Sequence, residues 1–309
     1  MTEFVRKRVS NVRNDIFSGI TVALALVPEA VAFAFVAGVD PLVGLYAAFM
    51  IGLVTSIFGG RPGMISGATG ALAVVMVSLV AKGNAMGMPD ENLGLYYLFA
   101  TVILMGVIQM LAGVLKLGKF VRLIPHPVMM GFVNGLAIVI FLSQLSMFKE
   151  KTGGGEVWMQ GSSLWLMLAL VAGTMFIMWG LPQIKLTRKL PEALIAILVI
   201  STIAILSNLD IATVGSFIRD GGGAGLKGGL PSLRLETFSK IPFDWESIKF
   251  ILPYALILAA IGLIESLMTL NLIDDLTETR GNGNRECLAQ GGANIITGLF
   301  GGMGGCAMI

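Results

Sequence analysis

Charged side chains are scarce in this chain, and their scarcity sets its class. Of the 309 residues only 13% are charged, whereas 55% are hydrophobic. A soluble domain carries about 25% charged residues, so this sequence lacks the polar side chains that would cover a globule. The balance of 21 basic and 19 acidic residues provides no excess of positive charge for a nucleic acid. These shortages exclude a soluble enzyme, a disordered protein and a nucleic-acid binder, and they leave an integral membrane protein.

Cysteine and histidine are nearly absent as well. The chain holds two cysteines, Cys287 and Cys306, and one histidine, His126. A structural zinc site needs four such ligands, so we expect neither a zinc site nor a disulfide framework. Catalysis by a Ser/His or Cys/His pair would have to use His126, which we interpret as an ordinary loop residue in a basic, proline-flanked segment. Since no Walker G-K-[ST] sequence is present either, we predict no enzyme, no ATP-driven pump and no cofactor.

Long apolar runs are what the sequence has instead. A membrane-spanning helix needs about 20 mostly apolar residues, and nine segments are candidates. They are residues 16–36, 42–58, 64–81, 95–115, 127–147, 163–181, 190–207, 248–272 and 287–300. Lys and Arg in the short loops gather mostly on the side of the N-terminus, and such loops face the cytoplasm. The pattern predicts a multi-pass protein of the cell (inner) membrane with a cytoplasmic N-terminus.

Two carboxyl groups lie in the middle of predicted spans. Glu29 and Glu265 have no Lys or Arg at matching depth, and a charge within the bilayer is costly and usually functional. A carboxyl that exists in both protonation states is a candidate proton carrier or sodium ligand, and Thr269 shares the helix face of Glu265. The structural alternative is a protonated glutamate that is hydrogen-bonded to a neighbouring helix.

The pattern F-G-G-x-x-G occurs twice, at residues 58–63 and 300–305. Each copy follows a short glycine-rich span, and we expect a helix with a buried glutamate, Glu29 or Glu265, before each of them. The first repeat begins at the first predicted helix and the second at the eighth, so an odd number of helices separates them. The second repeat is then upside down in the membrane. Inverted repeats with broken helices are typical of secondary transporters.

The residues after the first copy predict an anion site. Residues 66–73 have the pattern of an extended segment that turns into a helix near Thr69. The free N–H groups and the positive dipole end of such a half-helix bind anions without a basic residue, and the Thr69 hydroxyl donates one more hydrogen bond. The alternative is that the glycines serve close helix packing. A separate G-x-G-x-x-G at 223–228 lacks the strand and helix of a dinucleotide site, so we interpret it as a flexible extracytoplasmic loop.

Taken together, these residues resemble the SulP family of inorganic anion transporters. The resemblance is carried by residues 15–24, 27–34, 38–48, 65–70, 116–125 and 300–305, in that order. It implies an all-α polytopic membrane protein with a seven-plus-seven inverted-repeat transporter fold, broken half-helices and a STAS domain after the membrane domain. Residues 1–207 would be the first repeat, with spans 1–7, and 248–309 the start of the second, with spans 8–9 and the beginning of span 10. Residues 1–309 would then be a transmembrane transporter domain whose second repeat is incomplete, with the STAS domain absent from this chain.

The resemblance also implies a site between the facing half-helices of spans 3 and 10. Its substrate-binding residues would be Phe33, Ala68, Thr69, Gly70, Cys306 and Ala307, and its coupling-ion residues Glu29, Glu265 and Thr269, with a proton or a sodium ion at Glu265. The implied activity is proton- or sodium-coupled symport of an inorganic anion, sulfate or bicarbonate, by an elevator-like mechanism, in a homodimer within the lipid bilayer. A passive anion channel, an anion exchanger, a nucleobase transporter of the same fold and a purely structural membrane scaffold stay open as alternatives.

Overall fold

The computed structural model of this chain describes residues 12–86, 92–119, 126–145, 148–152, 155–183, 192–207, 209, 211, 229–241 and 244–308. The chain forms two compact units. The first contains the described residues of 26–140 and 226–309, and the second contains those of 11–25 and 141–225. The glycine loop predicted at 223–228 lies outside the described residues.

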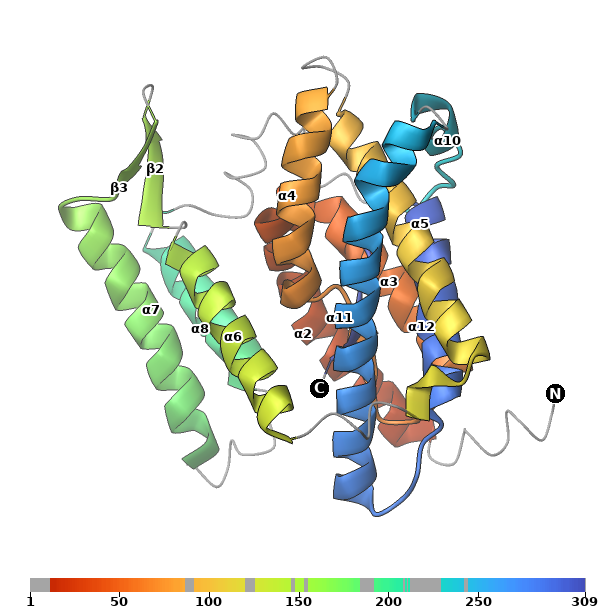
Figure 1. Ribbon diagram of the computed structural model, residues 1–309. Coiled ribbons are helices and arrows are strands. Elements are labelled where there is room, and N and C mark those ends of the chain that lie inside the picture. Colours follow the sequence, from red (N-terminus) through yellow and green to blue (C-terminus); the bar gives the residue numbers. More distant parts are fainter. Residues whose placement is uncertain are drawn as a thin grey trace. The chain divides into compact units, whose positions relative to one another are not determined.

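Each of the nine predicted spans contains a helix (Figure 1). The helices are α2 (Val12–Ala37), α3 (Pro41–Phe58), α4 (Gly70–Met86), α5 (Leu93–Val114), α6 (His126–Leu145), α7 (Ser162–Gly180), α8 (Glu192–Leu206), α11 (Trp245–Thr277) and α12 (Gly283–Leu299). Two short helical turns, η3 (Leu181–Gln183) and α10 (Thr237–Lys240), and a hairpin of β2 (Lys149–Thr152) and β3 (Gly155–Trp158) accompany them.

Four helical stretches among the described residues are long and apolar enough to cross a membrane. They are Pro41–Phe58, Leu93–Val114, Ser162–Gln183 and Trp245–Thr277. The predominance of helix confirms the predicted all-α class. The helix α2 continues through Pro28, so the proline does not divide this element.

The interpretation of His126 as a loop residue was wrong, because α6 begins at this residue. The physical reason is the proline that follows. Pro127 occupies the first turn of α6, where its fixed φ is already helical and its missing N–H would have had no intrahelical acceptor. A proline that usually ends a helix therefore starts one here.

Side-chain caps fix where three of the main helices begin. The carboxylate of Asp40 accepts a hydrogen bond from the backbone N–H of Leu42 at 2.8 Å, at the start of α3. Asp244 does the same for α11 through the N–H of Ser247, also at 2.8 Å. At the start of α12 the Asn282 side chain accepts from the N–H of Arg285 at 3.0 Å. Each cap satisfies a donor that helix geometry leaves unpaired.

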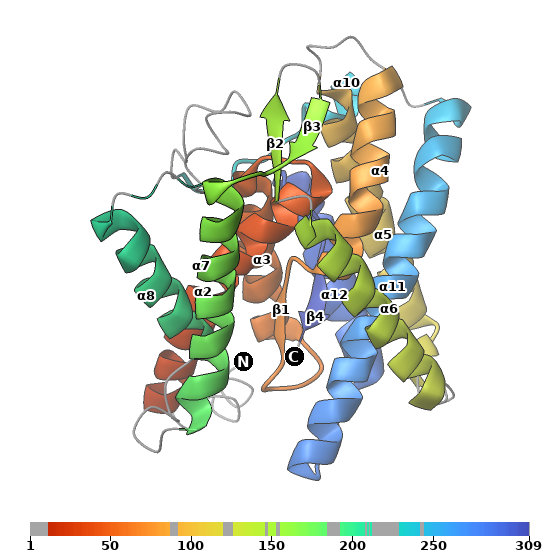
Figure 2. The same ribbon diagram turned by 90° about the vertical axis from the view of Figure 1, so that its left-hand side faces the viewer.

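Two strands of three residues each interrupt the helical first unit. The strands β1 (Ile65–Gly67) and β4 (Cys306–Met308) pair antiparallel, with Ser66 opposite Ala307 and Gly67 opposite Cys306. Figure 2 shows them side by side near the C-terminal end of the chain. The extended segment predicted before a half-helix is therefore confirmed, since β1 leads into α4 at Gly70. The predicted span 64–81 accordingly becomes helical only at Gly70.

The last described residues, where we expect the beginning of span 10, are extended. Residues 306–308 form the strand β4, which follows the second F-G-G-x-x-G as β1 follows the first. Their backbone N–H and C=O groups pair with those of β1, and an extended backbone of this kind cannot make helical hydrogen bonds at the same time.

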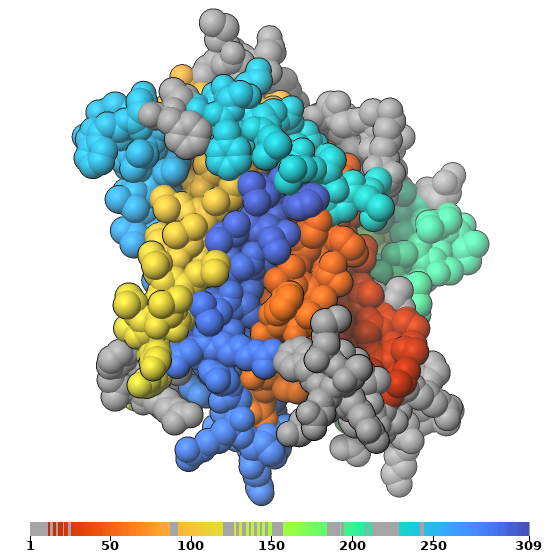
Figure 3. Space-filling model, turned by 90° about the vertical axis from the view of Figure 1, so that its right-hand side faces the viewer, coloured from red at the N-terminus to blue at the C-terminus, as the bar shows by residue number. Residues whose placement is uncertain are grey.

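The helices of the first unit pack through small residues. A Cβ atom added to Gly106 of α5 would lie 2.5 Å from the carbonyl oxygen of Gly291 in α12, and one added to Gly291 would lie 2.6 Å from that of Gly106. In Figure 3 the segments of α3, α12 and α5 lie side by side on one face. Because lipid tails are as apolar as the side chains, such close approach, and not removal from water, stabilises helix contacts in a membrane.

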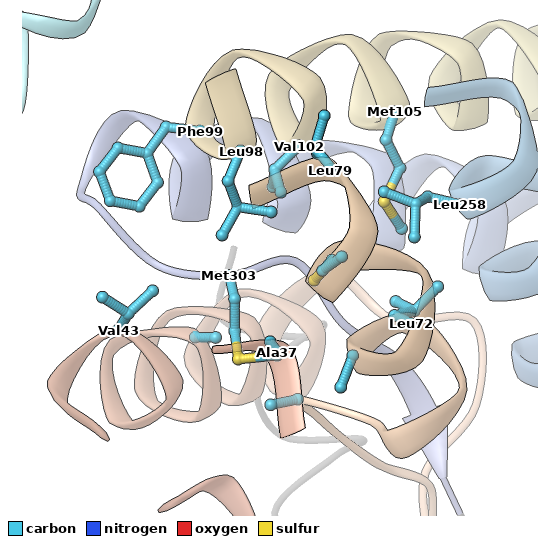
Figure 4. Close-up of a cluster of buried hydrophobic side chains, with 14 of the residues drawn as sticks. Ala37, Val43, Leu72, Leu79, Leu98, Phe99, Val102, Met105, Leu258 and Met303 are labelled. Carbon is cyan, nitrogen blue, oxygen red and sulfur yellow. The ribbon is translucent and has the colours of Figure 1, made fainter. Parts of the chain in front are cut away.

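A cluster of buried apolar side chains holds α4 and the second F-G-G-x-x-G in place (Figure 4). Leu72 and Leu79 of α4, Leu98 of α5 and Leu258 of α11 are each 0% exposed. Met303 lies in the segment between α12 and β4, is also 0% exposed, and belongs to the same cluster. Ala68, just before α4, and Cys306 of β4 belong to the cluster as well, so the segments around the two strands pack against one apolar core.

Candidate functional site

The site begins where β1 and β4 meet. A Cβ atom at Gly305 would lie 1.9 Å from the carbonyl oxygen of Gly67, so only glycine allows the two segments to approach this closely. The strands then bring Thr69, which directly precedes α4, next to Cys306. Residues that are 237 positions apart in the sequence thereby form one site.

A chain of three side chains crosses this junction. The thiol of Cys306 donates a hydrogen bond to the Oε2 atom of Glu265 at 3.0 Å. On its other side the sulfur lies 3.5 Å from the hydroxyl oxygen of Thr69. Cys306 is 0% exposed and Thr69 is 2% exposed. The predicted anion-binding and coupling residues are thus joined through a cysteine whose linking role the sequence did not indicate.

The helix α11 is attached to β4 by the residue after Glu265. The hydroxyl of Ser266 accepts a hydrogen bond from the backbone N–H of Ala307 at 3.0 Å. Thr269 lies one helical turn beyond Glu265 and is buried. The hydrogen bonds from Cys306 to Glu265 and from Ala307 to Ser266 therefore hold this part of α11 against β4.

The start of α4 presents backbone donors. The first intrahelical hydrogen bond runs from the N–H of Ala73 to the carbonyl oxygen of Thr69 at 3.1 Å. In such a helix the N–H groups of the first turn have no intrahelical acceptors, and the helix dipole adds partial positive charge there. Ala68 and Gly70 are buried at this end, so small side chains surround the donors. The arrangement suits a small anion.

Polar residues on one face of α12 form hydrogen bonds with the two segments that meet at the strand junction. The sequence reasoning missed this face. Glu286, Gln290 and Asn294 follow one another at intervals of four residues, which places them on one side of the helix. This spacing, in a helix made mainly of small and apolar residues, was the signal that could have revealed them. All three are buried, with exposures of 2%, 0% and 0% respectively.

Asn294 holds the backbone of Gly305 from both sides. Its amide nitrogen donates to the Gly305 carbonyl oxygen at 3.0 Å, and its amide oxygen accepts from the Gly305 N–H at 2.9 Å. The same nitrogen donates to the side-chain oxygen of Gln109 in α5 at 2.8 Å. Because β4 starts at the next residue, Asn294 fixes the position at which the strand begins.

Gln290 and Glu286 hold the corresponding segment of the first repeat, from Gly60 to β1. The amide nitrogen of Gln290 donates to the hydroxyl of Ser66 in β1 at 2.8 Å and to Oε1 of Glu286 at 2.9 Å. The Oε2 atom of Glu286 accepts from the backbone N–H of Gly60 at 2.7 Å. A continuous set of hydrogen bonds therefore runs from the first F-G-G-x-x-G to β1.

An ion pair ties the same F-G-G-x-x-G segment to the end of α11. The guanidinium of Arg61 pairs with the carboxylate of Asp274 and donates to both the hydroxyl and the carbonyl oxygen of Thr279, at 2.7 and 3.1 Å. Asp274 also accepts from the backbone N–H of Gly281 at 2.8 Å. Side-chain exposures of 5% for Arg61 and 12% for Asp274 show that the pair is largely buried.

Two of the predicted site residues lie away from this set of hydrogen bonds. Glu29 is exposed on α2, and it forms no hydrogen bond with another described residue. The expectation that a buried glutamate precedes each glycine motif is therefore not met in the first repeat. Phe33, one turn further along α2, is partly buried against the apolar cluster of Figure 4. Glu265, by contrast, is half-buried at the strand junction.

The fold and the site define a class of protein. A helix, a short strand and a second helix occur in one part of the chain, and a helix and a counterpart strand that runs in the opposite direction occur in another. This is the architecture of polytopic membrane proteins with inverted repeats and broken helices. More particularly, the chain belongs to the sulfate permease family, whose model matches residues 12–309. The predicted family is confirmed.

Curated relatives carry transport in their names. The chain is 46% identical over 299 residues to the putative sulfate transporter YbaR of Bacillus subtilis, covering 97% of this chain and 56% of that protein. It is 33% identical over 308 residues to the bicarbonate transporter BicA of a Picosynechococcus strain, covering 96% of this chain and 52% of that protein. The chain thus spans about half the length of the curated relatives it matches.

Solved structures show the same fold. The transmembrane domain of a cyanobacterial bicarbonate transporter BicA matches with a TM-score of 0.79 and 29% identity, covering 97% of this chain and 75% of that one. The murine Solute Carrier 26 family member A9 anion transporter, in its inward-facing state, matches with a TM-score of 0.73 and 17% identity, covering 97% and 52%. The predicted polytopic membrane fold of the inverted-repeat class is confirmed by these matches.

Proposed function

We propose that this chain is the anion-binding part of a secondary transporter that carries a small inorganic anion, sulfate or bicarbonate, across the cell membrane. The observation that carries the proposal is the linked set of Thr69, Cys306 and Glu265 at the start of α4. It combines hydrogen-bond donors for an anion with a carboxyl in a predicted span. The names of the relatives, sulfate transporter and bicarbonate transporter, support the choice of anion.

In the proposed site the anion is bound by neutral donors. The N–H groups of the first turn of α4 and the hydroxyl of Thr69 donate to its oxygens, and the small residues Ala68, Gly70 and Ala307 leave it room. Binding by backbone dipoles attracts negative charge without the strong ion pair that an arginine would form. An anion held in this way can be released on the other side of the membrane, as transport requires.

Glu265 is the proposed coupling residue. Its carboxyl lies next to the anion site and is joined to it through Cys306, so its charge and that of the anion repel each other unless a cation is present. A proton or a sodium ion on Glu265 removes that repulsion, and anion and cation then bind together. Symport follows from this mutual dependence. Thr269, one turn away on the same face, is the proposed second ligand of a sodium ion.

The proposed movement is of the elevator kind. All the proposed site residues belong to the first compact unit, so a site carried by one rigid body is compatible with the division of the chain. We further propose that the protein lies in the cell (inner) membrane with a cytoplasmic N-terminus and works as a homodimer. The excess of Lys and Arg in loops on one side supports the orientation.

Uptake into proteoliposomes that contain the purified protein tests the proposal. Labelled sulfate and labelled bicarbonate are offered under imposed proton and sodium gradients, to the native protein and to Glu265→Gln. We expect a gradient of one of the two cations to stimulate uptake of one anion, and Glu265→Gln to abolish the stimulation. The matched control is Glu246→Gln, because Glu246 is an exposed carboxylate in the first turn of the same helix. Uptake that ignores both gradients and the Glu265→Gln substitution would refute symport and leave an anion channel or exchanger.

A further inference from the structure

A cavity of about 490 Å³ lies in the first unit, away from the strand junction. Its walls come from the segment after α5, from the C-terminal half of α11, and from the residues that lead into α12. We call it the basic cavity. Thr69, Glu265 and Cys306 do not line it, so it is separate from the proposed transport site. Cavities of this size hold small molecules or the polar parts of larger ones.

Positive charge dominates the basic cavity. Lys119 and Arg280 line it, and none of its lining residues in the described part of the chain is acidic. Neither of these two cations forms an ion pair with another described residue. The carboxylates nearest to Arg280 along the chain, Glu278 and Asp275, are not among the lining residues and form no ion pair with Arg280. Two uncompensated cations at one cavity favour an anionic ligand.

Neutral hydrogen-bond donors complete the lining. Three asparagines, Asn271, Asn282 and Asn284, line the basic cavity. Asn282 uses its oxygen to cap Arg285, so its NH₂ group stays available. The side-chain oxygen of Asn284 is buried and has no hydrogen-bond partner among the described residues. The NH₂ groups of Asn271 and Asn282 are therefore the neutral donors that these lining residues offer to a ligand.

We propose that the basic cavity binds a phosphate group, carried either by the headgroup of an anionic phospholipid or by a soluble phosphate compound. Phosphate offers several strong acceptor oxygens, which match the guanidinium fork of Arg280, the ammonium of Lys119 and the amide donors. Both sources present the same group to the protein. The inference stands apart from the proposed transport function, because it uses none of the residues assigned to anion transport.

A ligand in the basic cavity would contact three separate segments of the first unit. Gly60 belongs to the first F-G-G-x-x-G, Gly118 follows α5, and Gly281 precedes α12, and all three line the cavity. Leu267, another lining residue, directly follows Ser266, which holds β4. A bound phosphate therefore braces the loops at one end of the helices that position the transport site.

Binding to the purified full-length protein tests the inference. Radiolabelled inorganic phosphate is titrated against delipidated protein in detergent, and retained lipids are counted by native mass spectrometry after reconstitution in nanodiscs of phosphatidylglycerol or of phosphatidylcholine. The test variant is Lys119→Gln/Arg280→Gln. The matched control is Lys240→Gln/Lys249→Gln, which removes the same charge at two exposed lysines that do not line the cavity.

We expect the test variant to weaken the affinity about tenfold or more and the control to leave it unchanged. If inorganic phosphate binds in detergent and this binding is weakened in the test variant, the soluble source is supported. If phosphatidylglycerol alone is retained, and is lost in the test variant, the lipid source is supported. Binding of neither probe, or binding that the test variant leaves intact, overturns the inference. A thermal melt of each variant shows that loss of binding is not loss of fold, and Arg280→Lys retains part of the affinity if charge is the cause.

Discussion

The thiol of Cys306 and the carboxylate of Glu265 are joined by a hydrogen bond of 3.0 Å, which links the strand β4 to the helix α11. A thiol is a weak donor, and here it is the group that faces a carboxyl in a predicted span. The same sulfur contacts Thr69. We therefore expect Cys306 to relay a change in the charge of Glu265 to the beginning of α4.

Replacement of Cys306 tests this relay. Cys306→Ser keeps an O–H donor of similar size, and we expect uptake within about threefold of the native value. Cys306→Val leaves the Glu265 carboxylate without that donor. Loss of a hydrogen-bond partner costs about 1–3 kcal/mol for a buried group, so we expect uptake to fall at least about tenfold. Cys287→Val is the control, since Cys287 is buried in a small apolar cluster. Equal uptake by Cys306→Ser and Cys306→Val would contradict the relay.

The approach of Gly305 to Gly67 leads to a stability prediction. In Gly305→Ala the new Cβ meets the Gly67 carbonyl oxygen at 1.9 Å, and backbone atoms on both sides must shift, at a cost of about 3 kcal/mol or more. We expect a clear loss of thermal stability in detergent. Gly292→Ala is the control in α12, because a Cβ there meets nothing within 4 Å. That change should stabilise the helix by about 0.5–1 kcal/mol, and similar losses for both variants would refute the packing argument.

The buried ion pair of Arg61 and Asp274 can be tested by comparing the stability of the two single variants with that of the double variant. Removing one partner leaves the other charge buried without compensation, which costs about 3–5 kcal/mol. We expect Arg61→Met and Asp274→Leu each to lower the unfolding temperature strongly. The double variant should lose less than the sum of the two, with a coupling energy of about 0.5–3 kcal/mol. Strict additivity of the two losses would show that the pair contributes no interaction of its own.

The Asp244 cap leads us to predict that the stability of the start of α11 depends on pH. The hydrogen bond from the Ser247 backbone N–H holds the pKa of Asp244 below its usual value. A carboxyl with a depressed pKa in the folded state stabilises the fold above its unfolded pKa, near 3.9, and that stability is lost as the pH falls through the folded value. We expect the protection of backbone amides at the start of α11 against hydrogen exchange to decrease as the pH falls through the folded-state pKa of Asp244. Asp244→Asn keeps an oxygen acceptor without the titration, so its amides should lack this decrease in protection.

The helices were predictable because their signal is local. Apolar runs near 20 residues long have few alternatives to a membrane helix, and the nine predicted segments all contain one. The broken third span was also predictable, because the residues around Gly67 and Gly70 indicate an extended chain that becomes a helix. Only its exact start, at Gly70, required the structure. His126 was misplaced because a neighbouring proline fits both a loop and a helix start.

The contacts of the site were less predictable, because they join distant parts of the chain. The sequence singled out Thr69 and Glu265 separately, but nothing in it showed that Cys306 lies between them. Gln290 and Asn294 were missed because uncharged polar residues in a predicted span do not show by themselves which distant residues they bond to. Their partners Ser66, Gln109 and Gly305 became known only from the structure. Glu29 has the same local signal as Glu265, a carboxyl in an apolar run, yet the structure leaves it exposed. Burial depends on neighbours that a single sequence does not display.

The pairing of β1 with β4 also sets an order of events during synthesis. Thr69 leaves the ribosome 237 residues before its partner Cys306, and a strand in a membrane protein cannot leave its backbone groups unpaired in lipid. During synthesis β1 therefore has no native strand partner until β4 has been made. A chain whose synthesis stops between these strands would retain its first helices but have no native partner for β1.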